Sequence, residues 1–250
     1  MSLRIRLQPY RLPLRRPWLS ARGARGERVG WLVHASLDGV GGYGDCAPLP
    51  EAGTEPEACA RDRLLTWSRR FGAESLTDQL VLLAERSSTQ TPAADAAIET
   101  ALLDLDARRR GLTLRARLCE AARERPASVP VNAALGALIR VQRSTVDSAL
   151  REGFDTLKLK VGVAAPADEL VAIARLCRRL PAHARLRLDA NQAWSVAEAT
   201  EMVDGLLRWT DWIESLEEPL RDPTDRDLAV LQRRAPFSIA LDESLPQRLQ

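Results

Sequence analysis

The spacing of apolar residues divides the first half of the chain into strands followed by helices. Residues 3–7 alternate apolar and charged side chains, and residues 31–37 form a second apolar run, as is typical of strands. Over residues 55–86 and 91–110 the apolar positions recur at helical spacing. Residues 1–125 are therefore predicted to form an α+β domain.

Residues 15–30 read RRPWLSARGARGERVG, a stretch that separates these strands. It is too rich in glycine and arginine to predict a strand, and long enough to predict a functional loop. A solvated hairpin loop is the open alternative.

After residue 126 short apolar strands alternate with helical segments. The predicted strands are residues 129–135, 156–161, 185–190, 212–216 and 237–241. The predicted helices are residues 141–152, 166–180, 196–208 and 225–234. This alternation predicts a parallel sheet, so residues 126–250 are expected to form the N-terminal part of a (β/α) TIM-type barrel.

The predicted barrel is incomplete. About five strands can be assigned, and an eight-stranded barrel of ordinary size would need roughly 80 further residues. We expect the chain to be a fragment or a truncated product, or its remaining strands to come from another chain.

Composition narrows the possible partners. The chain has 36 Lys and Arg against 34 Asp and Glu, which gives no reason to expect a nucleic-acid partner. No apolar run approaches the roughly 20 residues that cross a bilayer, so no membrane partner is expected. The four cysteines lack CxxC spacing and the first residues lack a signal-peptide core, which predicts a reduced cytoplasmic protein.

Polar residues at the predicted strand ends have a regular spacing of 25 to 29 residues. They are Asn132, Lys160, Asp189, Glu217 and Asp242. Each interval is close to one βα unit, so in a barrel these positions converge on one rim.

Two neighbouring strands turn charged side chains to one face. In residues 156–161 the two-residue period places Lys158 and Lys160 opposite the apolar side chains, and in the next strand it does the same for Arg187 and Asp189. Lysine inside a barrel is costly unless it is paired, so on its own this strand fits a functional site or a surface strand.

Three carboxylates at consecutive strand ends suit Mg²⁺, which prefers oxygen ligands. A lysine on the neighbouring strand would have its pKa lowered by such a cation and could act as a base. Each acid alone could equally cap the helix that follows it. The three acids and the lysine together favour a metal site.

The strings TLKLKVG, RLRLDANQAW, IESLEEPL and ALDES occur in this order. With them the chain resembles the muconate-lactonising branch of the enolase superfamily, and most of all its o-succinylbenzoate synthases. The segment GGYGDCAPLPEAGTE is similar to part of the capping domain of that family, with Asp45 where glutamate is more usual.

The resemblance implies a role for each candidate. The Mg²⁺ ligands would be Asp189, Glu217 and Asp242. Lys160 would be the base that removes the proton α to the substrate carboxylate, with Lys158 as its electrostatic partner. Asn191 and Arg187 would hold the ligands in place without binding the metal themselves. Glu218 faces the other way and is expected to be structural, and residues 15–30 would cover the substrate.

The implied activity is that of a Mg²⁺-dependent carbon–oxygen lyase, an o-succinylbenzoate synthase of menaquinone biosynthesis acting on a small carboxylate. A dipeptide epimerase or N-acylamino-acid racemase of the same superfamily is one alternative, and an inactive remnant is another. Such enzymes carry a second lysine in a K-P-x-x-x-G context, which does not occur in this sequence.

Overall fold

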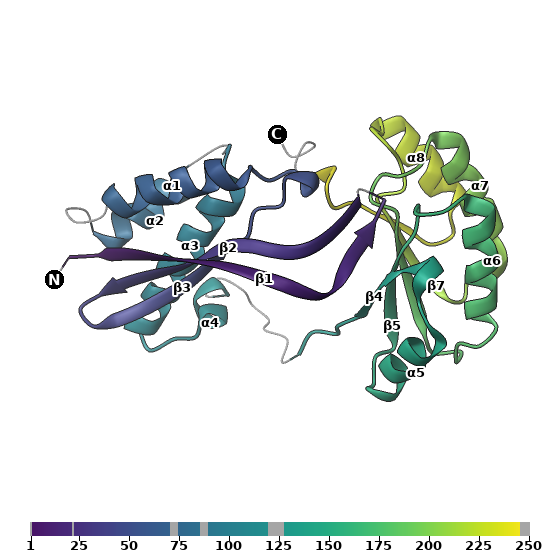
Figure 1. Cartoon of the computed structure of the whole chain (residues 1–250), viewed down its shortest axis with the longest axis horizontal. Coiled ribbons are helices and arrows are strands. Elements are labelled where there is room, and N and C mark those ends of the chain that lie inside the picture. The colour runs from purple at the N-terminus through teal and green to yellow at the C-terminus, as the bar shows by residue number, and fades with distance from the viewer. Residues whose placement is uncertain (1, 22, 71–74, 86–89, 120–127, 246–250) are drawn as a thin grey trace. The chain divides into compact units, whose positions relative to one another are not determined.

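The structure is a computed structural model that describes residues 2–21, 23–70, 75–85, 90–119 and 128–245 (Figure 1). The chain divides into two compact units. The N-terminal unit comprises Met1–Arg15 and Gly26–Ala127, and the C-terminal unit comprises Arg16–Arg25 and Ser128–Gln250. The second unit therefore includes a short segment from the beginning of the sequence.

The N-terminal unit has strands first and helices afterwards, as predicted. Its sheet has the order β1-β2-β3. Its elements are β1 (Arg4–Ser20), β2 (Gly23–Leu37), β3 (Val40–Cys46), η1 (Pro50–Ala52), α1 (Glu57–Arg70), α2 (Leu76–Ala84), α3 (Pro92–Arg109) and α4 (Leu114–Leu118). The helical pattern over residues 55–86 thus corresponds to two helices, and the short α4 was not predicted.

The glycines of β3 explain how α3 packs so closely on the sheet. A Cβ atom on Gly44 would lie 2.0 Å from the carbonyl oxygen of Ala97, and one on Gly42 would lie 2.4 Å from that of Ala101. Only glycine allows the two backbones this approach. Ala97 and Ala101 of α3 are themselves buried, so small residues line both sides of the contact.

The prediction of a loop over residues 15–30 is wrong. β1 continues to Ser20 and β2 starts at Gly23, so most of this segment is strand. Neighbouring strands satisfy each other's backbone hydrogen bonds, and this pairing outweighs the weak strand preference of arginine and glycine. The segment is a strand hairpin rather than a loop.

The C-terminal unit contains a parallel sheet with the order β4-β5-β6-β7-β8, flanked by helices. Its elements are β4 (Ala133–Ala137), η2 (Leu138–Arg140), α5 (Arg143–Arg151), β5 (Thr156–Lys160), α6 (Pro166–Cys177), β6 (Arg185–Asp189), α7 (Val196–Leu206), η3 (Leu207–Trp209), β7 (Ile213–Glu217), α8 (Asp225–Arg234) and β8 (Ser238–Ala240). The predicted α/β class and the five barrel strands are confirmed.

The placement of Asn132 at a strand end was wrong. It directly precedes β4, because this strand begins four residues later than the apolar run that predicted it. Val129 and Val131, which started that run, are exposed.

Local side-chain bonds fix where α7 and α8 begin. The Ser195 hydroxyl accepts from the backbone N–H of Glu198, whose carboxylate accepts from the N–H of Ser195. Thr224 and Asp227 repeat this exchange at the start of α8. Such caps stabilise a helix by about 0.5–2 kcal/mol and set the length of the loops after β6 and β7. No helix in the described parts of the chain is both long and apolar enough to span a bilayer.

The face of the parallel sheet that packs against the helices forms the core of this unit. Leu157, Leu159, Leu186 and Leu188 have no exposed surface, and they pack in one cluster with Ile173 and other helix residues. Their neighbours in sequence must then point to the opposite face, because side chains alternate along a strand. The leucines thus place the charged residues of β5 and β6 on the face of the sheet opposite the core.

We expect Leu186→Ala to lower the free energy of unfolding by about 2–5 kcal/mol, because it opens a cavity in this cluster. Val171→Ala, on the exposed side of α6, is the control and should change it by less than about 0.5 kcal/mol. Urea denaturation measures both. Equal effects would contradict the assignment of this face to the core.

Candidate active site at the carboxyl ends of the parallel strands

The register of the parallel strands brings five predicted residues side by side. Lys158 lies opposite Arg187 and Lys160 opposite Asp189 between β5 and β6, while Asp189 lies opposite Glu217 between β6 and β7. Parallel strands end at the same edge of a sheet, so these side chains share one rim. The proximity results from strand pairing rather than from loop conformation.

The two lysines are bonded directly to the carboxylates. The Nζ atom of Lys158 lies 2.8 and 2.7 Å from the two carboxylate oxygens of Glu217 and 2.9 Å from Oδ2 of Asp189. The Nζ atom of Lys160 lies 2.6 Å from the same oxygen of Asp189. The side chain of Asp189 is only 1% exposed. One ammonium group therefore bridges two carboxylates from neighbouring strands.

The network separates the pKa values of its two acids. Burial raises the pKa of Asp189, but hydrogen bonds from Lys160 and Lys158 outweigh it and hold this pKa below its ordinary value. Burial raises the pKa of Glu217, and the charges of Asp189 and Asp242 add to the effect, so it lies above its ordinary value despite Lys158. Without another cation, Glu217 is the acid that takes up a proton first.

Lys158 is held in its charged form. Burial lowers the pKa of this ammonium group, but the hydrogen bonds to Glu217 and Asp189 more than offset the effect and raise the pKa above its ordinary value. A lysine in this state is a counter-ion and not a base.

Asp242 lies two residues beyond the end of β8. It is close enough to raise the pKa of Glu217, and its backbone N–H donates to Oε1 of Glu218 over 2.6 Å. As the side chains stand, the described residues contain no group of three acidic, histidine or cysteine side chains arranged to hold a metal ion. The lysines occupy the carboxylates instead.

The donor set fits a divalent cation. Oxygens of Asp189 and Glu217 both lie within 2.9 Å of the Lys158 ammonium, so carboxylates from two strands converge on one positive charge. Mg²⁺ seeks oxygen ligands of this kind. The ammonium group stands in for such a cation.

The two supporting residues have different partners. The N–H of Asn191 donates to Oδ1 of Asp189 over 3.1 Å, so Asn191 helps to orient a predicted ligand. Arg187 instead binds Glu214 at 2.7 Å and donates to Asn132 at 3.3 Å. Arg187 thus holds an acid that is not among the predicted ligands.

Sequence patterns did not reveal Glu214 or Trp18. A register shift between β6 and β7 places Glu214 beside Arg187, and a regular two-residue period cannot show such a bulge. The indole ring of Trp18, from the segment expected to be a loop, lies 6.0 Å from Nζ of Lys160. It is close enough for a cation–π interaction with the predicted base.

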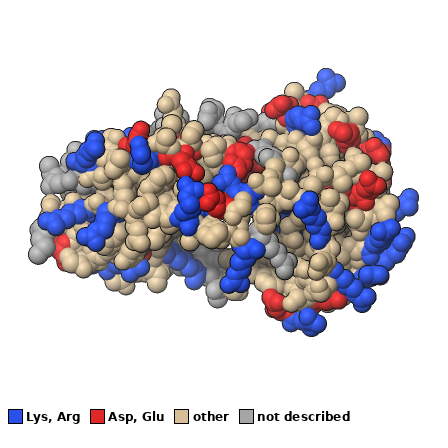
Figure 2. Space-filling view, viewed as in Figure 1, with Lys and Arg blue, Asp and Glu red and all other residues tan. Residues whose placement is uncertain are grey.

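A cavity of about 500 Å³ adjoins the ends of β5 and β6. It is lined by Gly162, Gln192, Arg221 and three further residues, among them Asn191. Asn191 is the one predicted site residue among them. Figure 2 shows both acidic and basic side chains on the face of each unit that is in view.

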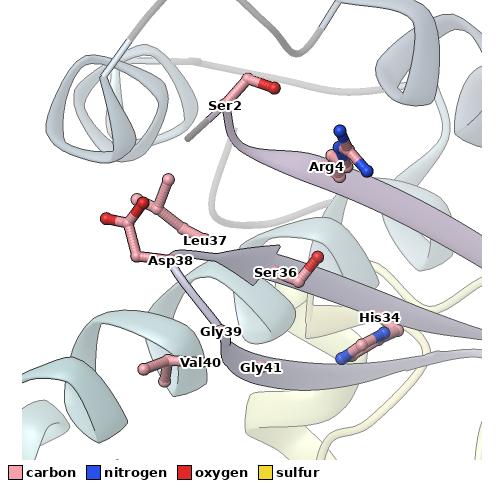
Figure 3. Close-up of a pocket in the computed structure, with 9 residues that line it drawn as sticks. All are labelled: Ser2, Arg4, His34, Ser36, Leu37, Asp38, Gly39, Val40 and Gly41. Carbon is pink, nitrogen blue, oxygen red and sulfur yellow. The ribbon is translucent and has the colours of Figure 1, made fainter.

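A second, smaller cavity of about 270 Å³ lies in the N-terminal unit (Figure 3). Arg4, His34 and Ser36 contribute its polar groups, together with Ser2 and Asp38. His34 stacks on Tyr43 with ring centroids 4.7 Å apart. None of the predicted site residues lines this cavity.

Asp189 should make stability depend on pH in the acid range. Its pKa in the folded chain lies below the value of about 3.9 for an unfolded chain, so its ion pairs contribute above that pH and are lost as the pH falls through the folded value. In EDTA, the stability difference between the unmodified chain and Asp189→Asn should shrink from neutral pH to about pH 3. Denaturation curves showing an unchanged difference would contradict these ion pairs.

Two family descriptions match the chain. Residues 4–118 match the N-terminal domain of the mandelate racemase / muconate lactonizing enzyme family, and residues 141–250 match the enolase C-terminal domain-like family. The matches fall on the strand-and-helix unit and on the parallel sheet.

Known relatives agree with these matches. The o-succinylbenzoate synthase of Thermosynechococcus vestitus is 30% identical over 94% of the chain and 67% of its own length. A hydrophobic dipeptide epimerase of a Flavobacteria bacterium is 28% identical over 93% of the chain and 66% of its own length. The chain thus spans about two thirds of each.

A solved structure shows the same arrangement. The crystal structure of o-succinylbenzoate synthase from Thermosynechococcus elongatus BP-1, complexed with Mg in the active site, matches with a TM-score of 0.72 and 27% identity over 96% of this chain and 69% of that one. These relatives are enzymes, and the predicted family is confirmed. The chain belongs to the enolase superfamily, in its mandelate racemase and muconate lactonizing enzyme branch.

Proposed function

We propose that this chain carries the metal site and the first base of a Mg²⁺-dependent o-succinylbenzoate synthase. The observation that carries the proposal is the ammonium group of Lys158 between Asp189 and Glu217, with Lys160 on the same aspartate. A cation site and a potential base thereby lie next to each other. The synthase from Thermosynechococcus vestitus supports this choice of reaction.

Asp189, Glu217 and Asp242 would hold Mg²⁺. A bound Mg²⁺ supplies positive charge beside the substrate carboxylate, where negative charge develops when the α-proton leaves. The buried position of Asp189 and its bond from the N–H of Asn191 keep one ligand fixed before the metal arrives. This preorganisation favours binding of Mg²⁺ to the site.

Lys160 would remove the α-proton. Its ammonium group shares the Asp189 carboxylate with that of Lys158, and this carboxylate is the one that would hold Mg²⁺. In its neutral form the Lys160 amine would accept the proton, the C–H electron pair would form the new double bond, and the hydroxyl group on the adjacent carbon would leave as water after protonation. Lys160 can return the proton for that step.

The lysine content of the chain supports this role. Lys158 and Lys160 are the only lysines in the sequence, and all the other residues counted among its Lys and Arg are arginines. Arginine stays protonated in proteins and cannot act as a base at neutral pH, whereas lysine can. The chain has lysine only where a titratable amine is useful.

An epimerase is the second candidate, because the hydrophobic dipeptide epimerase is nearly as similar to this chain as the synthase. Proton removal by Lys160 would serve both reactions. The reactions differ in their second step, which is loss of water in the synthase and return of a proton to the opposite face in the epimerase.

Lys160→Ala should abolish exchange of the substrate α-proton with deuterium from the solvent without weakening Mg²⁺ binding, because the lysine is not a ligand and its removal leaves Asp189 open to the metal. Asp189→Asn should instead weaken Mg²⁺ binding, because it changes a ligand of the metal. Mass spectrometry and calorimetry measure the two properties. Exchange that persists in Lys160→Ala would exclude it as the base.

Substrate identity is tested by supplying a hydroxycyclohexadiene carboxylate or hydrophobic dipeptides to the chain with Mg²⁺. The proposal expects formation of the aromatic product, monitored by its ultraviolet absorbance, and no racemisation of the dipeptides by chiral chromatography. Racemisation alone would favour the epimerase. No turnover of either, with no effect of Mg²⁺ on thermal stability, would favour an inactive remnant.

A further inference from the structure

Glu218 is a buried carboxylate that belongs to neither the metal ligands nor the base. It comes directly after Glu217, the last residue of β7, and is only 1% exposed. Its backbone φ is +44°, a left-handed conformation that costs free energy for a residue other than glycine. A buried charge in such a conformation requires compensating contacts.

Those contacts come almost entirely from the segment after β8. Oε1 of Glu218 accepts from the N–H of Asp242 at 2.6 Å, from the N–H of Ser244 at 2.8 Å and from the Ser244 hydroxyl at 2.7 Å. Oε2 accepts from the side-chain amide of Gln192 at 3.1 Å. One carboxylate therefore ties the ends of three strands together.

Asp242 needs this support because the sheet does not reach it. The pairing of β7 with β8 ends where Glu217 meets Ala240, and the last bond of the ladder runs from the N–H of Glu218 to the carbonyl of Ala240 at 2.9 Å. Past that point the backbone position of Asp242 depends on the Glu218 carboxylate. Asn191 adds a second tie through the Glu243 side chain, at 2.8 Å.

We infer that Glu218 is a positioning residue for the metal site, which sets the Asp242 carboxylate against Glu217 and Asp189. The inference rests on the proposed function, since it assumes that these three acids hold Mg²⁺. Consecutive residues at one strand end then have separate tasks: Glu217 contributes a ligand, and Glu218 fixes the position of the third ligand.

Glu218→Gln keeps the shape of the side chain but replaces the charged acceptor by a weaker amide. Calorimetric titration with MgCl₂, well below the melting temperature, should show a Kd about tenfold higher or more, the usual effect of losing a group that orients a ligand. Ser244→Ala removes one bond to Glu218 and leaves both backbone bonds, so it should raise the Kd by about threefold.

Glu55→Gln is the matched control. Glu55 is also a buried carboxylate, 4% exposed, and accepts from the N–H groups of Ala93 and Ala94 at the start of α3 in the N-terminal unit. It should lower the melting temperature and leave the Kd for Mg²⁺ unchanged. This separates a loss of stability from a loss of ligand placement.

Unchanged Mg²⁺ affinity in Glu218→Gln would overturn the inference and leave the proposed function standing. If that variant does not fold, Ser244→Ala decides in the same way, with a weaker affinity supporting the inference and an unchanged one overturning it. Failure of the unmodified chain to bind Mg²⁺ would overturn the proposed function itself, and the positioning role with it.

Discussion

The site depends on the ion pairs that join Asp189 to Lys158 and Lys160 on adjacent parallel strands. Asp189 is almost fully buried, and it is stabilised there because Lys158 and Lys160 both bind its carboxylate. An unpaired charge at this depth would cost several kcal/mol. The leucines on the other side of the same strands anchor the sheet, so the apolar core and the charged rim are two faces of one pattern.

In the structure the lysines neutralise the carboxylates, which is the first of two states that the proposed function requires. In the second, a divalent cation would take their place and leave an amine free to act as a base. The raised pKa of Lys158 and the lowered pKa of Asp189 belong to the first state, where hydrogen bonds between them outweigh burial. Because each group depends on the other, a metal ion would change both together.

The sequence predicted the sheet and the rim well because both depend on a two-residue period. Leu157 and Leu159 are buried, and Lys158 and Lys160 face inward, as the alternation of β5 requires. Sequence patterns did not predict the features that depend on pairing between residues far apart in the chain. Arginine and glycine at residues 15–30 do not show that β1 and β2 continue into a hairpin, and the bulge that places Glu214 next to Arg187 leaves no local signal. The burial of Glu218 likewise depends on backbone N–H groups of Asp242 and Ser244.

The absence of other lysines allows a direct measurement of the exchange between ammonium groups and metal. Protein labelled with ¹³C,¹⁵N-lysine should give NMR signals from Lys158 and Lys160 alone, since the sequence has no third lysine. Addition of MgCl₂ should shift both sets of signals and lower the pH at which the Lys158 amine titrates, because the metal would take over the carboxylates that both lysines bind. Signals that do not change with saturating MgCl₂ would contradict an exchange of the ammonium groups for the metal.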